Sequence, residues 1–193
     1  MDFAAAHIGN WSGYRRFQWA LGAVGWGRFP VLRRVLPEGN GGEVSPEDAG
    51  EALRELADFS TAGVIGIRAE LYDESGALVA TQNPAFGGLF TMGPGYRVGI
   101  DDNGLFVTGG DDEELFRARR IGQRTADDGC AWLTDLDHPS RGETLVPTVL
   151  PGGASRLLTR SRPYSAGDFA YTVEALTKIF RASVEIRSPV YWT

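Results

Sequence analysis

Carboxylate side chains occur in this sequence as neighbouring pairs and short runs. These are Asp101 with Asp102, Asp111 to Glu114, Asp127 with Asp128, and Asp135 with Asp137. Two carboxylates held side by side can divide the acid and base roles of a hydrolytic reaction. Each group, however, lies in or beside a predicted turn, where aspartate is favoured because it hydrogen-bonds the local backbone. Solvated turns are therefore the first interpretation, and acid–base catalysis is the alternative.

Two histidines, His7 and His138, and a single cysteine, Cys130, are the other candidates for a nucleophile, a general base or a metal ligand. Their spacing matches no metal-binding or catalytic pattern, and no serine lies in a G-x-S-x-G turn. Cys130 precedes apolar residues and is expected to be an inert buried thiol, whereas His138 in LDHPSRG is expected to be a turn residue. We therefore predict no catalytic residue, no metal site and no cofactor.

The glycine-rich segment LPEGNGGEVSPED, residues 36–48, has the composition of a ligand-binding loop. A phosphate loop needs a lysine followed by serine or threonine, and a dinucleotide loop needs a preceding strand, but the segment has neither. Its acidic and amide residues do not keep the alternating spacing of calcium ligands. The segment is therefore predicted to be a turn into a helix, with Ser45 as the N-cap. If it binds anything, we expect a protein surface that contacts Glu38, Asn40 and Glu43.

Apolar residues recur at helical spacing in three stretches, which predicts three helices. They span about 12–25, 46–59 and 165–182. Ser12 is the expected N-cap of the first helix, and Gly25 its end. Between the first two helices, a short apolar turn halts at Pro37 because proline disfavours continued helix before it.

Strands are predicted where apolar and polar residues alternate. One hairpin joins 64–72 to 77–81, a second joins 96–100 to 105–108 around Asn103-Gly104, and shorter strands lie at 130–133, 145–150 and 190–192. In the first strand, Arg68, Glu70 and Tyr72 are expected on a solvent-facing side. The run LFRARRI, residues 115–121, suits either period, and we predict a strand because it follows a turn-like GGDDE. The glycine- and proline-rich stretch after the first hairpin is predicted to be a loop anchored by Phe86 and Phe90.

These elements predict an α+β fold, in which an antiparallel twisted sheet of about six or seven strands has the helices packed mainly on one face. The length of 193 residues fits a single globular domain, 1–193. The formal charge of −6 repels phosphate backbones, so no nucleic-acid partner is expected. The lone cysteine excludes an intramolecular disulfide, and no apolar run is long enough to cross a membrane. No leader is expected at the N-terminus, and a cytoplasmic location is predicted.

Several stretches resemble, in their layout, small bacterial proteins regarded as immunity proteins of polymorphic toxin systems. These stretches are HIGNWSGYRRFQWALG, GGEVSPEDAGEALRELADF, ELFRARRIGQR and a terminal helix leading to SPVYW. The resemblance covers the first third and the last fifth of the chain. It implies a cytoplasmic protein that binds and neutralises one cognate toxin domain without chemistry of its own, and it assigns no contact residues.

The clustered acids favour the same function class on physical grounds. Acidic loops that gather at one end of a sheet would attract a basic protein surface, so Asp111, Asp112, Glu113 and Glu114 are predicted to contact the partner. The alternative is a small-molecule-binding or hydrolytic enzyme, with a pocket lined by Phe86, Phe90 and the tryptophans and served by His7 or an acidic loop. A third hypothesis is a structural subunit that forms homo-oligomers through its edge strands.

Overall fold

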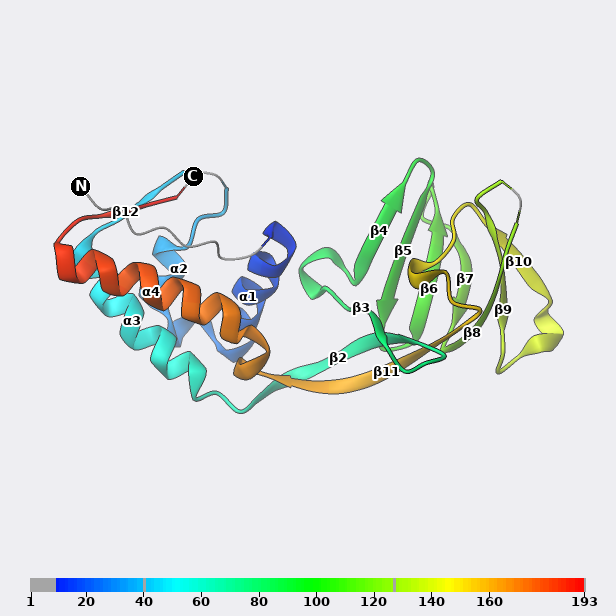
Figure 1. Cartoon of the computed structure of the whole chain (residues 1–193), viewed down its shortest axis with the longest axis horizontal. Coiled ribbons are helices and arrows are strands. Elements are labelled where there is room, and N and C mark those ends of the chain that lie inside the picture. The colour runs from blue at the N-terminus through cyan, green and yellow to red at the C-terminus, as the bar shows by residue number, and fades with distance from the viewer. Residues whose placement is uncertain (1–9, 40, 127, 193) are drawn as a thin grey trace. The chain divides into compact units, whose positions relative to one another are not determined.

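Four α-helices and twelve strands in antiparallel sheets make up the part of the chain that the structure describes, residues 10–39, 41–126 and 128–192. In this computed structural model the chain divides into two compact units (Figure 1). The helical unit comprises the residues up to Gly66 and those from Tyr164 onward, and the sheet unit comprises Ile67–Pro163. The expected α+β class is confirmed.

Helix α1, Trp11–Val24, opens the helical unit and has well-defined ends. Its N-cap is Asn10, whose side-chain oxygen accepts a hydrogen bond from the backbone N–H of Gly13 at 2.8 Å. The prediction of Ser12 as the N-cap was therefore wrong. The helix begins one residue before Ser12, at Trp11, so the residue whose side chain caps the free N–H groups of the first turn is Asn10. Gly25 ends the helix as predicted, with a φ of 123° that favours glycine.

Two helices follow, α2 at Pro30–Val35 and α3 at Pro46–Ser60. The start of α3 is confirmed: Ser45 accepts a hydrogen bond from the backbone N–H of Asp48 at 3.1 Å, and Pro46 occupies the first helical position. Helix α2 is capped from α3, because the carboxylate of Glu55 accepts hydrogen bonds from the first backbone N–H groups of α2, at 2.9 and 2.7 Å. One carboxylate thereby fixes two helices to each other.

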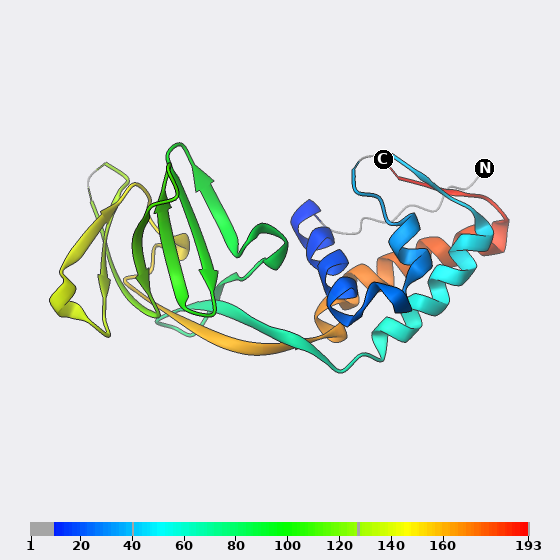
Figure 2. The same cartoon turned by 180° about the vertical axis from the view of Figure 1, so that it is seen from behind.

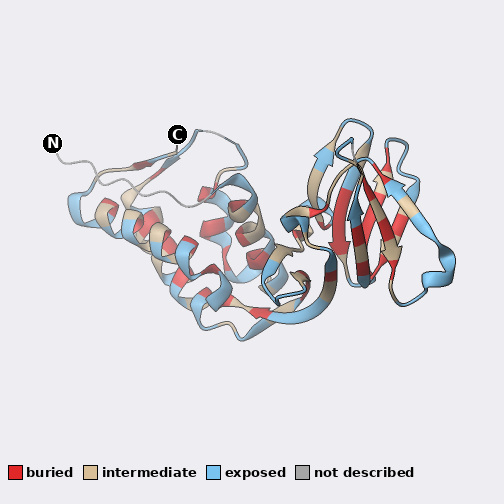
Figure 3. Ribbon diagram, turned by 45° about the vertical axis from the view of Figure 1, so that its right-hand side comes forward, coloured by how far each residue is buried: buried red, intermediate tan, exposed pale blue. Residues whose placement is uncertain are grey.

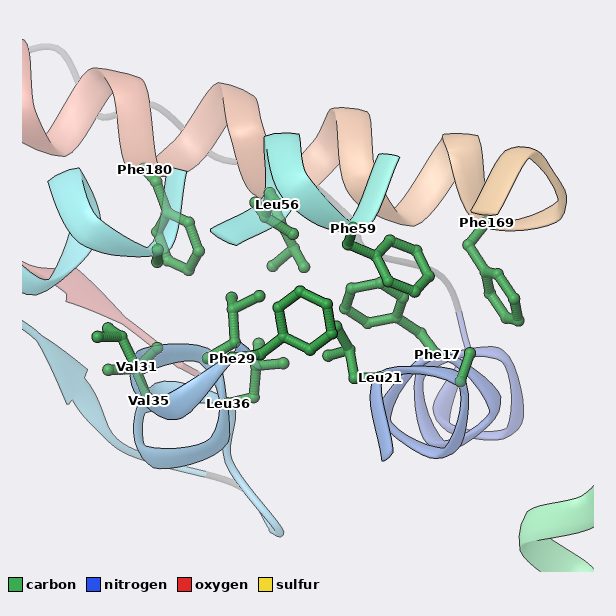
Figure 4. Close-up of a cluster of buried hydrophobic side chains, with 14 of the residues drawn as sticks. Phe17, Leu21, Phe29, Val31, Val35, Leu36, Leu56, Phe59, Phe169 and Phe180 are labelled. Atoms are coloured by element: carbon green, nitrogen blue, oxygen red, sulfur yellow. The ribbon is translucent and has the colours of Figure 1, made fainter. Parts of the chain in front are cut away.

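The last helix is α4, Ala170–Ile186, which follows a 3-10 turn, η5, at Ala166–Phe169. Phe17 of α1, Phe59 of α3 and Phe180 of α4 are fully buried and point into one cluster with Phe29 (Figure 4). The rings of Phe17 and Phe59 meet edge to face, with centroids 5.3 Å apart. Burial of each ring contributes roughly 1.5–3 kcal/mol. The helices thus bury their apolar sides against one another, with their outer sides exposed (Figure 3), whereas the sequence predicted packing on a sheet face.

The glycine-rich segment is held in place by a two-stranded sheet, of which the sequence predicted only the strand at 190–192. Strand β1, Glu43–Val44, pairs with β12, Val190–Tyr191. The indole N–H of Trp192 donates to the carbonyl of Val35 at 3.1 Å, and its backbone N–H donates to the carbonyl of Gly42 at the same distance. The segment therefore serves to join elements, in agreement with the prediction of a turn into a helix.

The sheet unit holds the remaining ten strands. The six-stranded sheet has the order β10-β9-β8-β11-β2-β3 and consists of β2 Val64–Asp73, β3 Leu78–Thr81, β8 Arg120–Thr125, β9 Ala131–Asp135, β10 Glu143–Val146 and β11 Arg156–Ser165. The four-stranded sheet has the order β4-β5-β6-β7 and consists of β4 Leu89–Gly93, β5 Tyr96–Asp101, β6 Gly104–Gly109 and β7 Glu114–Ala118. One sheet of about six or seven strands was expected, and the six-stranded sheet agrees with this. The second sheet was not expected, and it lies beside the first in views from both sides (Figure 2).

The two sheets share one apolar core. Leu71 of the first sheet and Ile100 and Leu105 of the second are fully buried members of the same cluster. The ambiguous run LFRARRI is strand, as predicted, except at Arg119, where the chain passes from β7 of one sheet to β8 of the other. The buried positions of the run are Phe116 and Ala118 before the break and Ile121 after it. The spacing changes from two residues to three, so no single repeat fits the run.

Candidate functional site

The acidic run that the sequence singled out forms a tight turn between β6 and β7. The backbone N–H of Gly109 donates to the carbonyl of Glu113 at 2.8 Å, and the N–H of Asp112 donates to the carbonyl of Gly109 at 3.2 Å. Asp112 has a φ of 64°, in the left-handed region that aspartate tolerates better than most residues. All four acids are exposed, and the turn fixes the backbone that carries them.

Two of these four carboxylates are neutralised within the chain. Asp112 forms an ion pair with Arg97 of β5, and Glu114 accepts a hydrogen bond from Nε of Arg117 at 2.7 Å. Asp111 and Glu113 make no ion pair within the described residues and remain as exposed negative charges. The site that the sequence predicted from four acids therefore offers two unpaired ones.

Arg117 supports the turn from the outer face of the four-stranded sheet. Its guanidinium also contacts both carboxylate oxygens of Asp101, at 2.7 and 2.8 Å, and it lies 5.0 Å from the ring centroid of Phe106. Partial burial disfavours its charge, but the hydrogen bonds that Arg117 donates to Asp101 and Glu114 outweigh this and raise its pKa. The Phe106 ring lies against Gly99 on the neighbouring strand, where a Cβ atom would overlap it. The support is thus built from residues of β5, β6 and β7.

The other predicted contact residues belong to the helical unit. Glu38 is exposed, and its carbonyl accepts a hydrogen bond from Arg15 at 2.5 Å. Glu43 is exposed on β1, opposite Tyr191. Asn40 lies outside the described residues. The predicted contact surface therefore consists of two groups, one on each unit.

His138 has a buried partner that its sequence context did not indicate. Its Nδ1 lies 3.0 Å from a carboxylate oxygen of Asp135, whose other oxygen accepts hydrogen bonds from the backbone N–H groups of Asp137 and His138. Burial raises the pKa of Asp135, but these hydrogen bonds outweigh it and hold the pKa below its usual value. Within the described residues no hydroxyl or thiol contacts His138, so the pair closes a turn, as predicted for this histidine.

Cys130 gains no catalytic setting from its described surroundings. Cys130 is half-buried rather than fully buried as expected, and its interaction with Asp128 raises the pKa of the thiol, which favours the unreactive protonated form. His7 lies outside the described residues. In the proposed pocket of the alternative enzyme, Phe90 packs against the sheet core and Phe86 is exposed, while Trp11, Trp19 and Trp26 belong to the helical unit.

The alternation of residues along the sequence did not predict the cluster of charged side chains that β2 and β11 form together. Glu70 is fully buried and contacts Arg68 at 2.9 Å and Arg162 at 3.8 Å, while the hydroxyl of Tyr72 donates to its second oxygen. The side of β2 that was expected to face solvent is therefore buried at Arg68 and Glu70. The reason is β11, which was not predicted and which places Arg160 over the Tyr72 ring, 5.2 Å from its centroid.

The described part of the chain contains no cluster of three or more metal-ligating side chains, and no helix in it is both long and apolar enough to cross a membrane. Comparisons of the sequence with protein-family models and with curated proteins, and of the fold with solved structures, found no significant match.

Proposed function

We propose that this chain is a protein-binding module, an immunity protein that acts in the cytoplasm and neutralises a cognate bacterial toxin by occlusion. The observation that supports the proposal best is the turn between β6 and β7, which exposes Asp111 and Glu113, whose side chains form no ion pair with any described residue. Two unpaired carboxylates on a fixed backbone are suited to pair with lysine or arginine side chains of a basic partner surface.

The ion pairs beside this turn favour one conformation of it before any partner binds. Arg97 and Arg117 neutralise Asp112 and Glu114, which limits repulsion among the four acids. A turn that is already ordered costs less conformational entropy on binding than a flexible acidic loop. Exposed charges at the rim of an interface act mainly on the association rate and its salt dependence.

The test begins with the product of the gene adjacent to this one, which the proposal expects to be a toxin, purified and titrated against this chain. The double variant Asp111→Lys, Glu113→Lys is expected to slow association at least about tenfold at low salt and to reduce the salt dependence of the rate. The matched control is Glu174→Lys, Glu185→Lys, which changes the net charge equally on exposed positions of α4.

Two results would contradict the proposal. If the neighbouring protein does not bind, or if its toxicity is unchanged by coexpression of this chain, the immunity function is wrong. If the two double variants bind alike, the chain still binds its partner, but the β6–β7 turn is not the contact.

A further inference from the structure

A hollow of about 410 Å³ opens on the outer face of the six-stranded sheet. Its walls include three arginines, Arg120, Arg156 and Arg160, together with Leu136, Leu158 and the hairpin turn at residues 73–76. Small-molecule sites in proteins span roughly 300–1,000 Å³, so the hollow is large enough for a small ligand. All of its lining residues belong to the sheet unit.

The strand register brings the three arginines together. Arg156, Leu158 and Arg160 alternate along β11, so their side chains lie on one face of the sheet. Arg120 of β8 pairs directly with Leu158. The arginines therefore surround Leu158 on three sides, two along its own strand and one across from it. Arg160 is also held by the Tyr72 ring on the adjacent strand.

The two carboxylates of the hairpin turn are already engaged by nearby donors. Asp73 accepts hydrogen bonds from the backbone N–H groups of Ser75 and Ala77, both at 2.9 Å, and from the Ser75 hydroxyl at 2.6 Å. These bonds lower the pKa of Asp73, so it is fully ionised and locked into the turn at neutral pH. Glu74 accepts from the backbone N–H of Arg156 at 3.1 Å rather than from its guanidinium.

The guanidinium groups, in contrast, retain free donors. Arg156 is exposed, and its side chain makes no ion pair within the described residues. Arg120 contacts Asp137 through one nitrogen at 3.2 Å, and both of these side chains are exposed, so a ligand can compete for Arg120 at small cost. Arg160 has an aromatic contact but no carboxylate partner among the described residues.

We propose that this hollow, the arginine pocket, binds a small organic phosphate, with its phosphate group among Arg120, Arg156 and Arg160 and its organic part on Leu136 and Leu158. Guanidinium groups recognise phosphate and carboxylate through paired hydrogen bonds. Donors on three sides suit a tetrahedral phosphate, whose oxygens point in several directions, better than a planar carboxylate. The leucines favour a ligand with an apolar or ring portion over free phosphate.

The experiment is a calorimetric titration of the full chain with phenyl phosphate, inorganic phosphate and benzoate. Phenyl phosphate is expected to bind most tightly, and the variant Arg156→Gln, Arg160→Gln to weaken its binding at least about tenfold. The matched control is Arg124→Gln on β8, an exposed arginine that pairs with Glu143 outside the pocket. This control is expected to leave the affinity unchanged.

If loss of Arg160 impairs folding, the single variant Arg156→Gln still decides the question, because the exposed Arg156 side chain has no ion pair with a described residue that the substitution could break. Equal binding of phenyl phosphate to the Arg156→Gln and wild-type chains would overturn the proposal. Tighter binding of benzoate, equal binding of inorganic phosphate, or no binding at millimolar concentration would overturn the assignment of an organic phosphate. None of these outcomes depends on the toxin partner, since the acidic turn contributes no residue to the pocket.

Discussion

Glu70 shows how much a single buried side chain can depend on distant parts of the sequence. A buried carboxylate is costly unless it is paired and hydrogen-bonded, and Glu70 has Arg68 and Tyr72 on its own strand and Arg162 on β11. The hydrogen bond to Glu70 is the main cause that raises the pKa of Tyr72, so this phenol stays protonated and able to donate. Residues two apart on one strand were expected to share a face, but the burial of that face depends on a strand about ninety residues further along the chain.

Asp135 gives a pH-dependent prediction. Replacement by asparagine, Asp135→Asn, is expected to lower the free energy of unfolding at pH 7 by roughly 1–3 kcal/mol, because the charge-assisted hydrogen bonds are weakened. The folded pKa of Asp135 is lowered, so its contribution is present above the ordinary value of 3.8 and is lost as the pH falls through the folded value. Urea unfolding at pH 7 and near pH 3 should therefore show the gap between wild type and variant narrowing in acid.

The control for this measurement is Asp102→Asn, because the Asp102 side chain is exposed and makes no ion pair in the described residues. It should change the unfolding free energy little at either pH. A gap for Asp135→Asn that is as large near pH 3 as at pH 7 would show that the carboxylate charge is not what stabilises this turn.

Local sequence signals were sufficient for some elements. Helix α3 has its cap, its first proline and its apolar side within one continuous stretch. The hairpin of β5 and β6 was predicted from Asn103-Gly104, and it turns one residue earlier, at Asp102 and Asn103, because Gly104 already pairs with Asp101. Strand β11 lacked such a signal: only Leu157 and Tyr164 of its ten residues are buried, so apolar residues do not alternate along it. Strand β4 lies in a stretch that was predicted to be a loop because of its glycines and prolines.

The candidate site likewise has one part that local sequence signals predict and another that depends on strand pairing. The turn at Asp111 to Glu114 could be predicted, since GGDDE is a turn sequence. The pairing of Asp112 with Arg97 could not, because it depends on the register of β5 with β6. The arginine pocket could not be predicted either, since it requires the pairing of β8 with β11.

The close fit of β5 against β6 gives a second prediction. Gly99→Ala is expected to lower the free energy of unfolding by about 1–3 kcal/mol, because a methyl group there would overlap the Phe106 ring. Gly63→Ala is the matched control, since a Cβ at Gly63 would meet no atom within 4 Å. Chemical denaturation of the two variants measures the difference, and equal stability would mean that the Phe106 ring can move aside without cost.

Each of the two units has its own buried cluster, so the effect of a core substitution should depend on the unit that carries it. Phe59→Ala is expected to destabilise the helical unit by roughly 3–5 kcal/mol, since the ring contacts Phe17, Phe29 and Phe169. Hydrogen exchange should then lose protection in α3 and α4 while β5 and β6 keep theirs.

The reciprocal variant is Leu105→Ala in β6, whose side chain is fully buried in the sheet core. It should reduce protection in β5 and β6 and leave α3 and α4 unchanged. If either substitution lowers protection equally in both units, the chain unfolds cooperatively as the single domain that its length predicted.

The helical unit is assembled from two stretches of sequence that are separated by the entire sheet unit. During synthesis, α1, α2 and α3 leave the ribosome first, but Leu176 and Phe180 of α4, which complete their core, follow only after about 100 further residues. At roughly 5–20 residues per second this delay lasts about 5–20 s. For that time the apolar sides of α1, α2 and α3 lack the α4 side chains that cover them in the folded chain.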